Sequence, residues 1–220
     1  MRIILYILIL TMSFQFNRDD LNAFAEKPHL IGRLIGKNKL KDLHSKWIIN
    51  VWMHGIPLQA HRNSYKTTAV TEVGSIWWLL FHPSDRIAIY RKPYTEAARI
   101  LNAIRKYFDM QPLIKLFEHV HGFVPKLIQK KEDVLTFNFK RTVTREGSLN
   151  AYGIENIRTG THFEKAIADD FVTLLDRTSK AKREHTKQSV MELVTNIMEP
   201  GQKVGFVGTP WAISDAWSLD

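Results

Sequence analysis

The stretch AHRNSYKTTAV, residues 60–70, decides the fold that we expect for this chain. It places a polar loop, ending in the pair Lys66 and Thr67, between the apolar stretch GIPLQA (55–60) and the longer apolar segment KTTAVTEVGSIWWLLF (66–81). The first apolar stretch predicts a strand and the second predicts a buried helix. A phosphate-binding loop occurs between a strand and a helix, because loop N–H groups and the helix N-terminus can surround phosphates.

The loop lacks the glycines of the usual phosphate-binding pattern, since Ala60 and Tyr65 stand at those positions. Lys66 can still neutralise phosphate charge, and Thr67 can bind Mg²⁺ through its hydroxyl. Considered alone, the stretch is a weak match, and a basic loop that opens a helix is the preferred interpretation.

Two later strand ends change this interpretation. AIADD (166–170) ends an apolar strand with two carboxylates, which suit a phosphate-bound Mg²⁺ or, alternatively, cap the following helix. VGFVGTPW (204–211) ends another strand at Thr209, whose hydroxyl could sense a γ-phosphate. Ligands of open α/β sheets bind at the carboxyl ends of the strands, so the three stretches together favour a nucleotide site.

Apolar periodicity predicts further strands and helices. Alternation at period two predicts strands at RIAIYRK (86–92) and within DVLTFNFKRTVT (133–144), the latter in a hairpin or a sheet. A helical period predicts a helix over YTEAARILNAIRKYFDM (94–110), capped by Thr95, and a basic helix over residues 177–198. This alternation implies an α/β sheet flanked by helices.

The N-terminal part is expected to be mainly helical. Asn17 is a candidate cap for a first helix, and LKDLHSKWIINVW (40–52) has a helical period. The residues expected on its apolar face are Leu43, Trp47, Ile48 and Val51. Between these helices, KPHLIGRLIGKNK (27–39) is interrupted by one proline and two glycines, which predicts a linker or a short turn.

Composition limits the function classes. The 220 residues include 31 Lys and Arg against 22 Asp and Glu, a net charge of +9, which suits a polyanionic partner such as nucleic acid or an anionic membrane. Without cysteine there is no disulfide, thiolate zinc site or cysteine nucleophile. The apolar run Ile3–Leu10 is shorter than the ~20 residues of a membrane span. We expect a buried strand or helix edge there, with a signal peptide as the alternative.

The stretches HRNSYKTT, AIADDFVTLLDRTSKAKRE and GTPWAISDAW, preceded by LHSKWIINVW, resemble the ATPase domain of the large terminase subunit of tailed bacteriophages. That family packages DNA into the phage prohead. The resemblance extends from about Lys27 to the end of the chain. It implies a P-loop NTPase-type domain over residues 53–220 after a helical segment over residues 1–52, without the C-terminal nuclease domain of full terminases.

The resemblance also implies ATP and Mg²⁺ as cofactors and a role for each site residue. Lys66 would bind the β- and γ-phosphates, while Thr67 and Asp169 would hold Mg²⁺. Asp170 stands where the family usually has a catalytic Glu, and Arg62 stands where terminases carry an arginine that acts on the γ-phosphate. The other implied nucleotide-binding residues are Ala60, His61, Asn63, Ser64, Tyr65 and Thr209.

The implied function is an ATPase motor that packages double-stranded DNA, in the cytoplasm of a bacterial host. The implied partners are the DNA, the portal and the small terminase subunit, with the active motor as a homo-oligomeric ring and no membrane. Two alternatives stay open: a helicase-like DNA translocase, and an inactive truncated prophage remnant that binds DNA without ATP turnover.

Three further features have ordinary structural interpretations. The basic run DRTSKAKREHTK (176–187) is interpreted as a solvated helix face, with a DNA-tracking or subunit-contacting surface as the alternative. Trp77 and Trp78 lie in an apolar helix and are expected in the core. His119 and His121 lie two residues apart, a spacing that points to different faces of a helix, and are expected to be structural.

Overall fold

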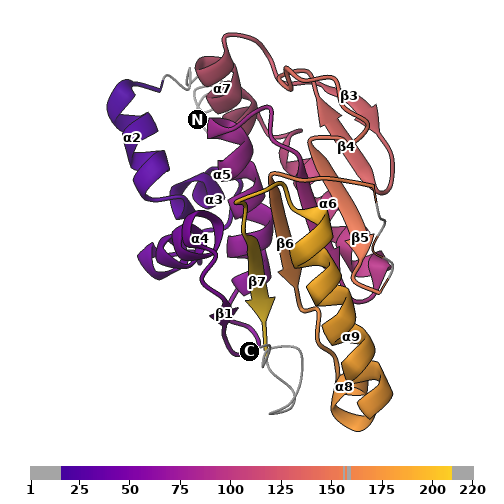
Figure 1. Ribbon diagram of the computed structural model, residues 1–220. Coiled ribbons are helices and arrows are strands. Elements are labelled where there is room, and N and C mark those ends of the chain that lie inside the picture. Colours follow the sequence, from indigo (N-terminus) through magenta and orange to yellow (C-terminus); the bar gives the residue numbers. More distant parts are fainter. Residues whose placement is uncertain (1–15, 156, 158–159, 210–220) are drawn as a thin grey trace.

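The computed structural model describes residues 16–155, 157 and 160–209. The apolar run Ile3–Leu10 and the end of the VGFVGTPW stretch, from Pro210 onward, lie outside the described residues. The described part is an α/β fold in which helices flank one seven-stranded sheet (Figure 1). The sequence-based expectation of an α/β sheet with N-terminal helices is confirmed.

The sheet has the order β1-β7-β6-β2-β5-β4-β3. Its strands are β1 (Leu58–Gln59), β2 (Ile87–Arg91), β3 (Leu127–Lys130), β4 (Val134–Phe137), β5 (Leu149–Gly153), β6 (Lys165–Asp169) and β7 (Val204–Gly208). Neighbours from β1 to β5 are parallel, and β4 and β3 continue the sheet as an antiparallel hairpin. The central strands are buried on both faces, which explains their apolar composition.

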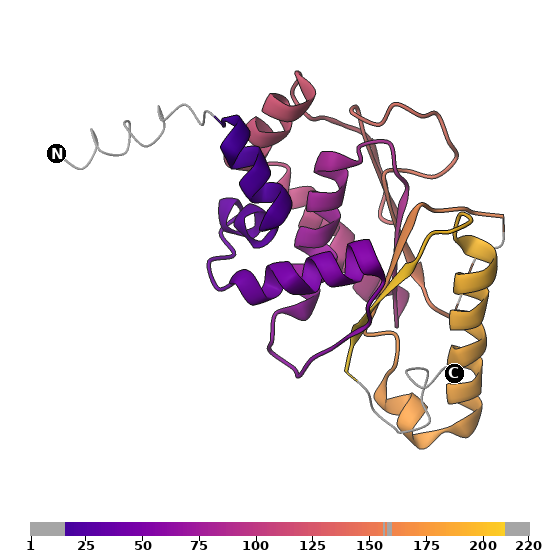
Figure 2. The ribbon, with the colours of Figure 1, turned by 60° about the vertical axis from the view of Figure 1, so that its left-hand side comes forward.

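Helices cover both faces of this sheet. They are α2 (Arg18–Glu26), α3 (His29–Leu34), α4 (Asp42–His54), α5 (Gly74–Phe81), α6 (Tyr94–Tyr107), α7 (Gln111–His121), α8 (Leu174–Thr178) and α9 (Lys180–Glu192), with the π-helical segments η1 (Thr67–Val73) and η2 (Leu193–Ile197). Figure 2 shows α9 on the opposite side of the sheet from α4.

The alternation of side chains along β2 divides the core in two. Ile87 and Ile89 pack into a large cluster with residues of α2 to α7, whereas Ala88 and Tyr90 pack into a smaller cluster with residues of α9 and η2. Successive strand residues point to opposite faces, so each face of the strand contributes to a different cluster. The N-terminal helices therefore share an apolar core with the sheet.

Several element predictions are confirmed. Asn17 caps α2, because its side chain accepts a hydrogen bond from the backbone N–H of Asp20 and Asp20 bonds back to Asn17. Trp77 and Trp78 are both 6% exposed and belong to the core, as expected. The segment 66–81 is helical, although its first part is the π-helical η1 rather than regular α-helix.

The prediction of a linker over residues 27–39 is wrong, because α3 occupies His29–Leu34. Gly32 lies inside this helix rather than at a turn. A Cβ at Gly32 would lie 2.6 Å from Leu40 Cδ1, so the glycine allows the close approach of the following chain. This glycine is therefore explained by close packing. The sequence pattern alone does not distinguish a glycine in a tightly packed helix from a glycine in a turn.

Two smaller expectations are also wrong, and a third is confirmed only in part. Thr95 does not cap α6: the helix begins at Tyr94, and its N-cap position is Pro93, without a side-chain cap bond. Leu43 does not face the core, because it is 53% exposed. The basic helix expected over residues 177–198 is interrupted at Ser179, which ends α8 and caps α9.

Among the described residues, no helix combines the length and the apolarity that crossing a membrane would require.

Candidate active site

The carboxyl ends of four parallel strands meet at one edge of the sheet. Gln59 of β1 pairs with Gly208 of β7, and Asp169 of β6 pairs both with Val207 of β7 and with Arg91 of β2. The polar loop that begins at residue 60 leaves the sheet at this edge and runs into η1. Parallel register therefore brings together three stretches that are far apart in the sequence.

The loop adopts left-handed backbone conformations without glycine. Asn63 has φ 64° and Tyr65 has φ 60°. Such conformations cost non-glycine residues on the order of 1–3 kcal/mol each, so the surrounding structure must hold them. The Tyr65 carbonyl accepts a hydrogen bond from the Ala69 N–H at 2.8 Å, which joins the loop to the first turn of η1.

His44 of α4 holds the loop from the other side. Its Nδ1 accepts a hydrogen bond from the Lys41 N–H at 2.9 Å, so Nε2 carries the proton and donates to the Ser64 carbonyl at 3.2 Å. The Lys39 ammonium lies 5.6 Å from the centroid of the Tyr65 ring. From the sequence, His44 was known only to lie in the segment upstream of the loop. The structure shows that its side chain is hydrogen-bonded to the loop backbone.

Thr67 and Asp169, the two expected Mg²⁺ ligands, lie in contact. The Thr67 hydroxyl donates to Asp169 Oδ1 at 3.2 Å, and the Thr71 hydroxyl donates to Oδ2 at 2.9 Å. Asp169 is fully buried. Sequence reasoning missed Thr71, although its position four residues after Thr67 puts both hydroxyls on one side of a helical segment.

Burial, together with the neighbouring Asp170 carboxylate, raises the pKa of Asp169 to about 6. The Arg91 guanidinium and the hydroxyls of Thr71 and Thr67 oppose this rise in pKa by stabilising the charged form. A hard cation would bind the deprotonated carboxylate, so its binding below about pH 6 would release a proton.

Asp169→Asn is expected to stabilise the ligand-free protein at neutral pH by on the order of 1–3 kcal/mol. The pKa of the folded-state carboxyl is raised above its unfolded value, so the buried charge is costly once the pH exceeds about 6, whereas below about pH 4 the carboxyl is protonated in both states. Urea unfolding at the two pH values measures the difference. If Asp169→Asn changed the free energy of unfolding equally at both pH values, the raised pKa assigned to Asp169 would be contradicted.

Asp170 lies between two cations. Its Oδ1 is 3.6 Å from Lys66 Nζ, and its Oδ2 accepts a hydrogen bond from Arg91 Nη2 at 2.7 Å. Its backbone has φ 45°, and its N–H donates to the Val207 carbonyl at 2.8 Å, which fastens this turn to β7. Only 8% of Lys66 is exposed. The Lys-Thr loop and the paired aspartates thus form one charged site.

The alternative role of the aspartates as helix caps does not match the structure. Helix α8 is capped by Thr173, whose backbone N–H and hydroxyl both bond to Asp176. Neither Asp169 nor Asp170 takes part in this cap, because both are bonded to residues of the loop, η1 or β2.

A cavity of about 400 Å³ opens beside these groups. Of the residues expected at the site, it is lined by Arg62, Lys66, Asp170 and Thr209. The Thr209 hydroxyl donates to the Ala60 carbonyl at 2.9 Å, so the end of β7 is tied to the start of the loop. A second hollow of about 310 Å³ is lined by residues 63–68. The exposed His61 lines neither cavity.

No protein-family model matches the chain, and no curated protein matches it.

Sequence reasoning also missed Arg91 and Lys92, which line the cavity. The Lys92 side chain is 7% exposed and contacts Glu155 at 2.8 Å and Asp176 at 3.2 Å. Both cations follow the apolar part of RIAIYRK, so the rule that ligands gather at strand ends would have found them.

The cavity can accept a phosphorylated ligand. Arg62, Lys66, Arg91 and Lys92 line it, against the carboxylates of Glu96 and Asp170. In the described part of the chain, no cluster of three or more His, Cys, Asp or Glu residues is present that could hold a metal by itself. Mg²⁺ fits here only with a small number of protein oxygens, and phosphate and water would supply the rest, as is usual for this ion.

Proposed function

We propose that this chain binds and hydrolyses ATP at the edge of the sheet formed by β1, β6 and β7. One observation carries the proposal: Lys66 and Thr67, which follow each other in the loop, contact Asp170 and Asp169, which follow each other at the end of β6. A cation, a hydroxyl and two carboxylates at strand ends are the groups that phosphoryl transfer requires.

The proposed reaction is the in-line attack of water on the γ-phosphorus. The new bond joins the water oxygen to phosphorus, and the bond to the β,γ-bridging oxygen breaks, so that ADP leaves with the electron pair. Asp170 orients the water and accepts its proton, while Lys66 and Arg62 stabilise charge on the phosphate oxygens. Mg²⁺, held by Thr67 and Asp169, would neutralise charge on the β- and γ-phosphates when bound.

We further propose that hydrolysis drives the packaging of double-stranded DNA, as in the terminase large subunits that the sequence resembles. The net charge of +9 supports a polyanionic partner. The bond from Thr209 to Ala60 supports coupling between β7 and the nucleotide loop. A homo-oligomeric ring, a portal and a small terminase subunit are the partners that this function would need.

The test is ATP hydrolysis by the purified chain, with and without duplex DNA, beside Lys66→Ala. Removing the lysine removes the ammonium nearest the proposed γ-phosphate position, so the rate should fall to background. Background rates in both proteins would refute the hydrolase. Hydrolysis accompanied by strand separation, rather than by movement along intact duplex, would favour the helicase-like translocase.

A second candidate is a DNA-binding protein without ATP turnover. It is favoured by the ion pairs that Asp170 makes with Lys66 and Arg91, which occupy the groups that catalysis needs. Tyr65, at φ 60° immediately before the lysine, adds a bulky residue where phosphate would approach the backbone. Duplex binding without any hydrolysis in the wild type would support this candidate.

A further inference from the structure

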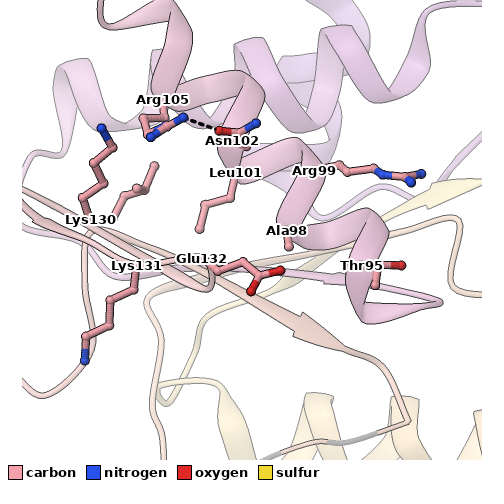
Figure 3. A pocket seen from close by; sticks show the side chains of 10 residues that line it. Thr95, Ala98, Arg99, Leu101, Asn102, Arg105, Lys130, Lys131 and Glu132 are labelled. Atoms are coloured by element: carbon pink, nitrogen blue, oxygen red, sulfur yellow. Dashed lines mark hydrogen bonds between the residues drawn. The ribbon is translucent and has the colours of Figure 1, made fainter.

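A second basic cavity lies between α6 and the β3–β4 hairpin, apart from the proposed nucleotide site (Figure 3). Its volume is about 550 Å³. The apolar side chains of Ala98, Leu101 and Leu135 contribute to its lining. Four cationic side chains also line it: Arg99 and Arg105 from α6, Lys130 from the end of β3, and Lys131 from the turn that follows.

The positive charge of this cavity is poorly compensated. Glu132 is the carboxylate that lines it, against four cations. Arg105 Nη2 donates to Asn102 Oδ1 at 2.6 Å, and this neutral partner leaves the charge in place. Lys130 and Lys131 are exposed, and neither forms an ion pair with any other described residue. An anion that entered the cavity would therefore meet several unneutralised cations.

We propose that this cavity binds the phosphate backbone of nucleic acid. Cations from two elements line one hollow, which matches a ligand with several consecutive phosphates better than a single anion. Lysine and arginine contacts to phosphate require no sequence reading, because they neutralise charge and release counterions. The proposal rests in part on the proposed function, since it supplies the DNA site that an ATP-driven packaging motor needs.

A chain of ion pairs connects this cavity to the nucleotide site. Arg99, whose side chain is 76% exposed, pairs with Glu96 one helical turn earlier. The second oxygen of Glu96 lies 3.8 Å from Arg91 Nη1, and Arg91 in turn bonds to Asp170. Arg91 therefore stands between two carboxylates, Glu96 and Asp170.

This arrangement couples the two sites. A phosphate bound in the cavity attracts Arg99 away from Glu96, and Glu96 is then left to pair with Arg91. A stronger pair between Glu96 and Arg91 weakens the bond from Arg91 to Asp170. The Asp170 carboxylate then becomes available to orient water. Nucleic acid would in this way increase the rate of hydrolysis by changing how the charge of Arg91 is shared between its two carboxylate partners.

The binding step is tested by fluorescence anisotropy of a labelled DNA duplex over a range of salt concentrations. The double variant Lys130→Gln, Lys131→Gln should bind less tightly and reduce the slope of log K against log salt by about 2, or about 1 for each lost contact. The control Lys27→Gln, Lys46→Gln makes the same charge change at exposed positions at the end of α2 and on α4, and should behave as wild type. Glu132→Gln should tighten binding.

Equal losses of duplex affinity in the two double lysine variants would overturn the proposal, because they would mean that only the net charge of the protein matters. The proposal would also be overturned if the variant Lys130→Gln, Lys131→Gln kept its binding to duplex DNA but lost binding to phosphatidylglycerol vesicles. That result would favour a membrane surface as the ligand. Inactivity of the wild type toward ATP would refute the proposed hydrolase but would leave the anisotropy result intact, so the two failures are distinguishable.

The coupling step is tested by Glu96→Gln in the ATP hydrolysis assay. This variant should bind duplex at least as tightly as wild type, since it removes a carboxylate near Arg99, and yet lose the stimulation of hydrolysis by duplex. Stimulation of Glu96→Gln equal to that of wild type would overturn the relay. Lys130→Gln, Lys131→Gln should keep the rate measured without DNA and need more duplex for half-maximal stimulation.

Discussion

Asp170→Asn is expected to lower kcat for ATP hydrolysis by about 10²–10⁴-fold, the usual contribution of a positioned acid or base. The substitution keeps the size of the side chain and removes the negative charge that would orient water and accept its proton. It also removes the ion pairs with Lys66 and Arg91, although Arg91 keeps its pair with Glu96, so less negative charge opposes the phosphates. ATP affinity should therefore be unchanged or higher. Steady-state kinetics and nucleotide titration measure the two effects separately.

Asn is a suitable replacement because Asp170 has φ 45°, and Asn is among the residues that tolerate this left-handed conformation. A folding defect is thus not expected, and the midpoint of thermal unfolding checks this. Lys66→Ala is the comparison, because it should lose ATP affinity as well as rate. If Asp170→Asn and the wild type hydrolysed ATP at the same rate, Asp170 would have no role in the chemical step.

The meeting of the loop with the paired aspartates could be predicted from the sequence, whereas the contacts of Thr71 and Arg91 were missed. Lys66 and Thr67 end the loop that follows one strand, Asp169 and Asp170 end another strand, and parallel strands place such ends together. The missing glycines made the loop a weak match to the usual phosphate-binding pattern when it was considered alone. In the structure Tyr65 and Asn63 adopt left-handed backbone conformations without glycine.

Strand β5 and helix α3 could not be predicted from apolar patterns. The sequence of β5, Leu149–Gly153, includes Asn150, which interrupts an apolar run although it is fully buried. Its side-chain amide donates to the carbonyls of Ile87 and Gly147, at 3.1 and 2.9 Å, so its polarity is satisfied inside the fold. The Ile87 carbonyl is provided by the tertiary structure, just as the packing of Leu40 and Val73 explains the glycine within α3.

Trp52→Ala is expected to lower the free energy of unfolding by about 3–5 kcal/mol, the range for removing a large aromatic side chain from a core. Trp52 is 1% exposed, and its ring stacks on Trp78 with centroids 5.6 Å apart. Its Nε1–H donates to the Val70 carbonyl of η1 at 2.8 Å. The packing leaves no spare room, since a Cβ at Gly74 would lie 2.2 Å from Trp52 Nε1.

The loss should also affect the proposed nucleotide site, because η1 carries both Thr67 and Thr71. Trp52→Phe keeps most of the apolar area and removes the hydrogen bond to η1, so it should cost about 1–3 kcal/mol. Met53→Ala, at a position on the same helix that is 50% exposed, should change stability by about 0.5 kcal/mol or less. Urea unfolding followed by far-ultraviolet circular dichroism ranks the three variants. Equal losses for Trp52→Ala and Met53→Ala would contradict the assigned role, because the core position would then matter no more than the surface position.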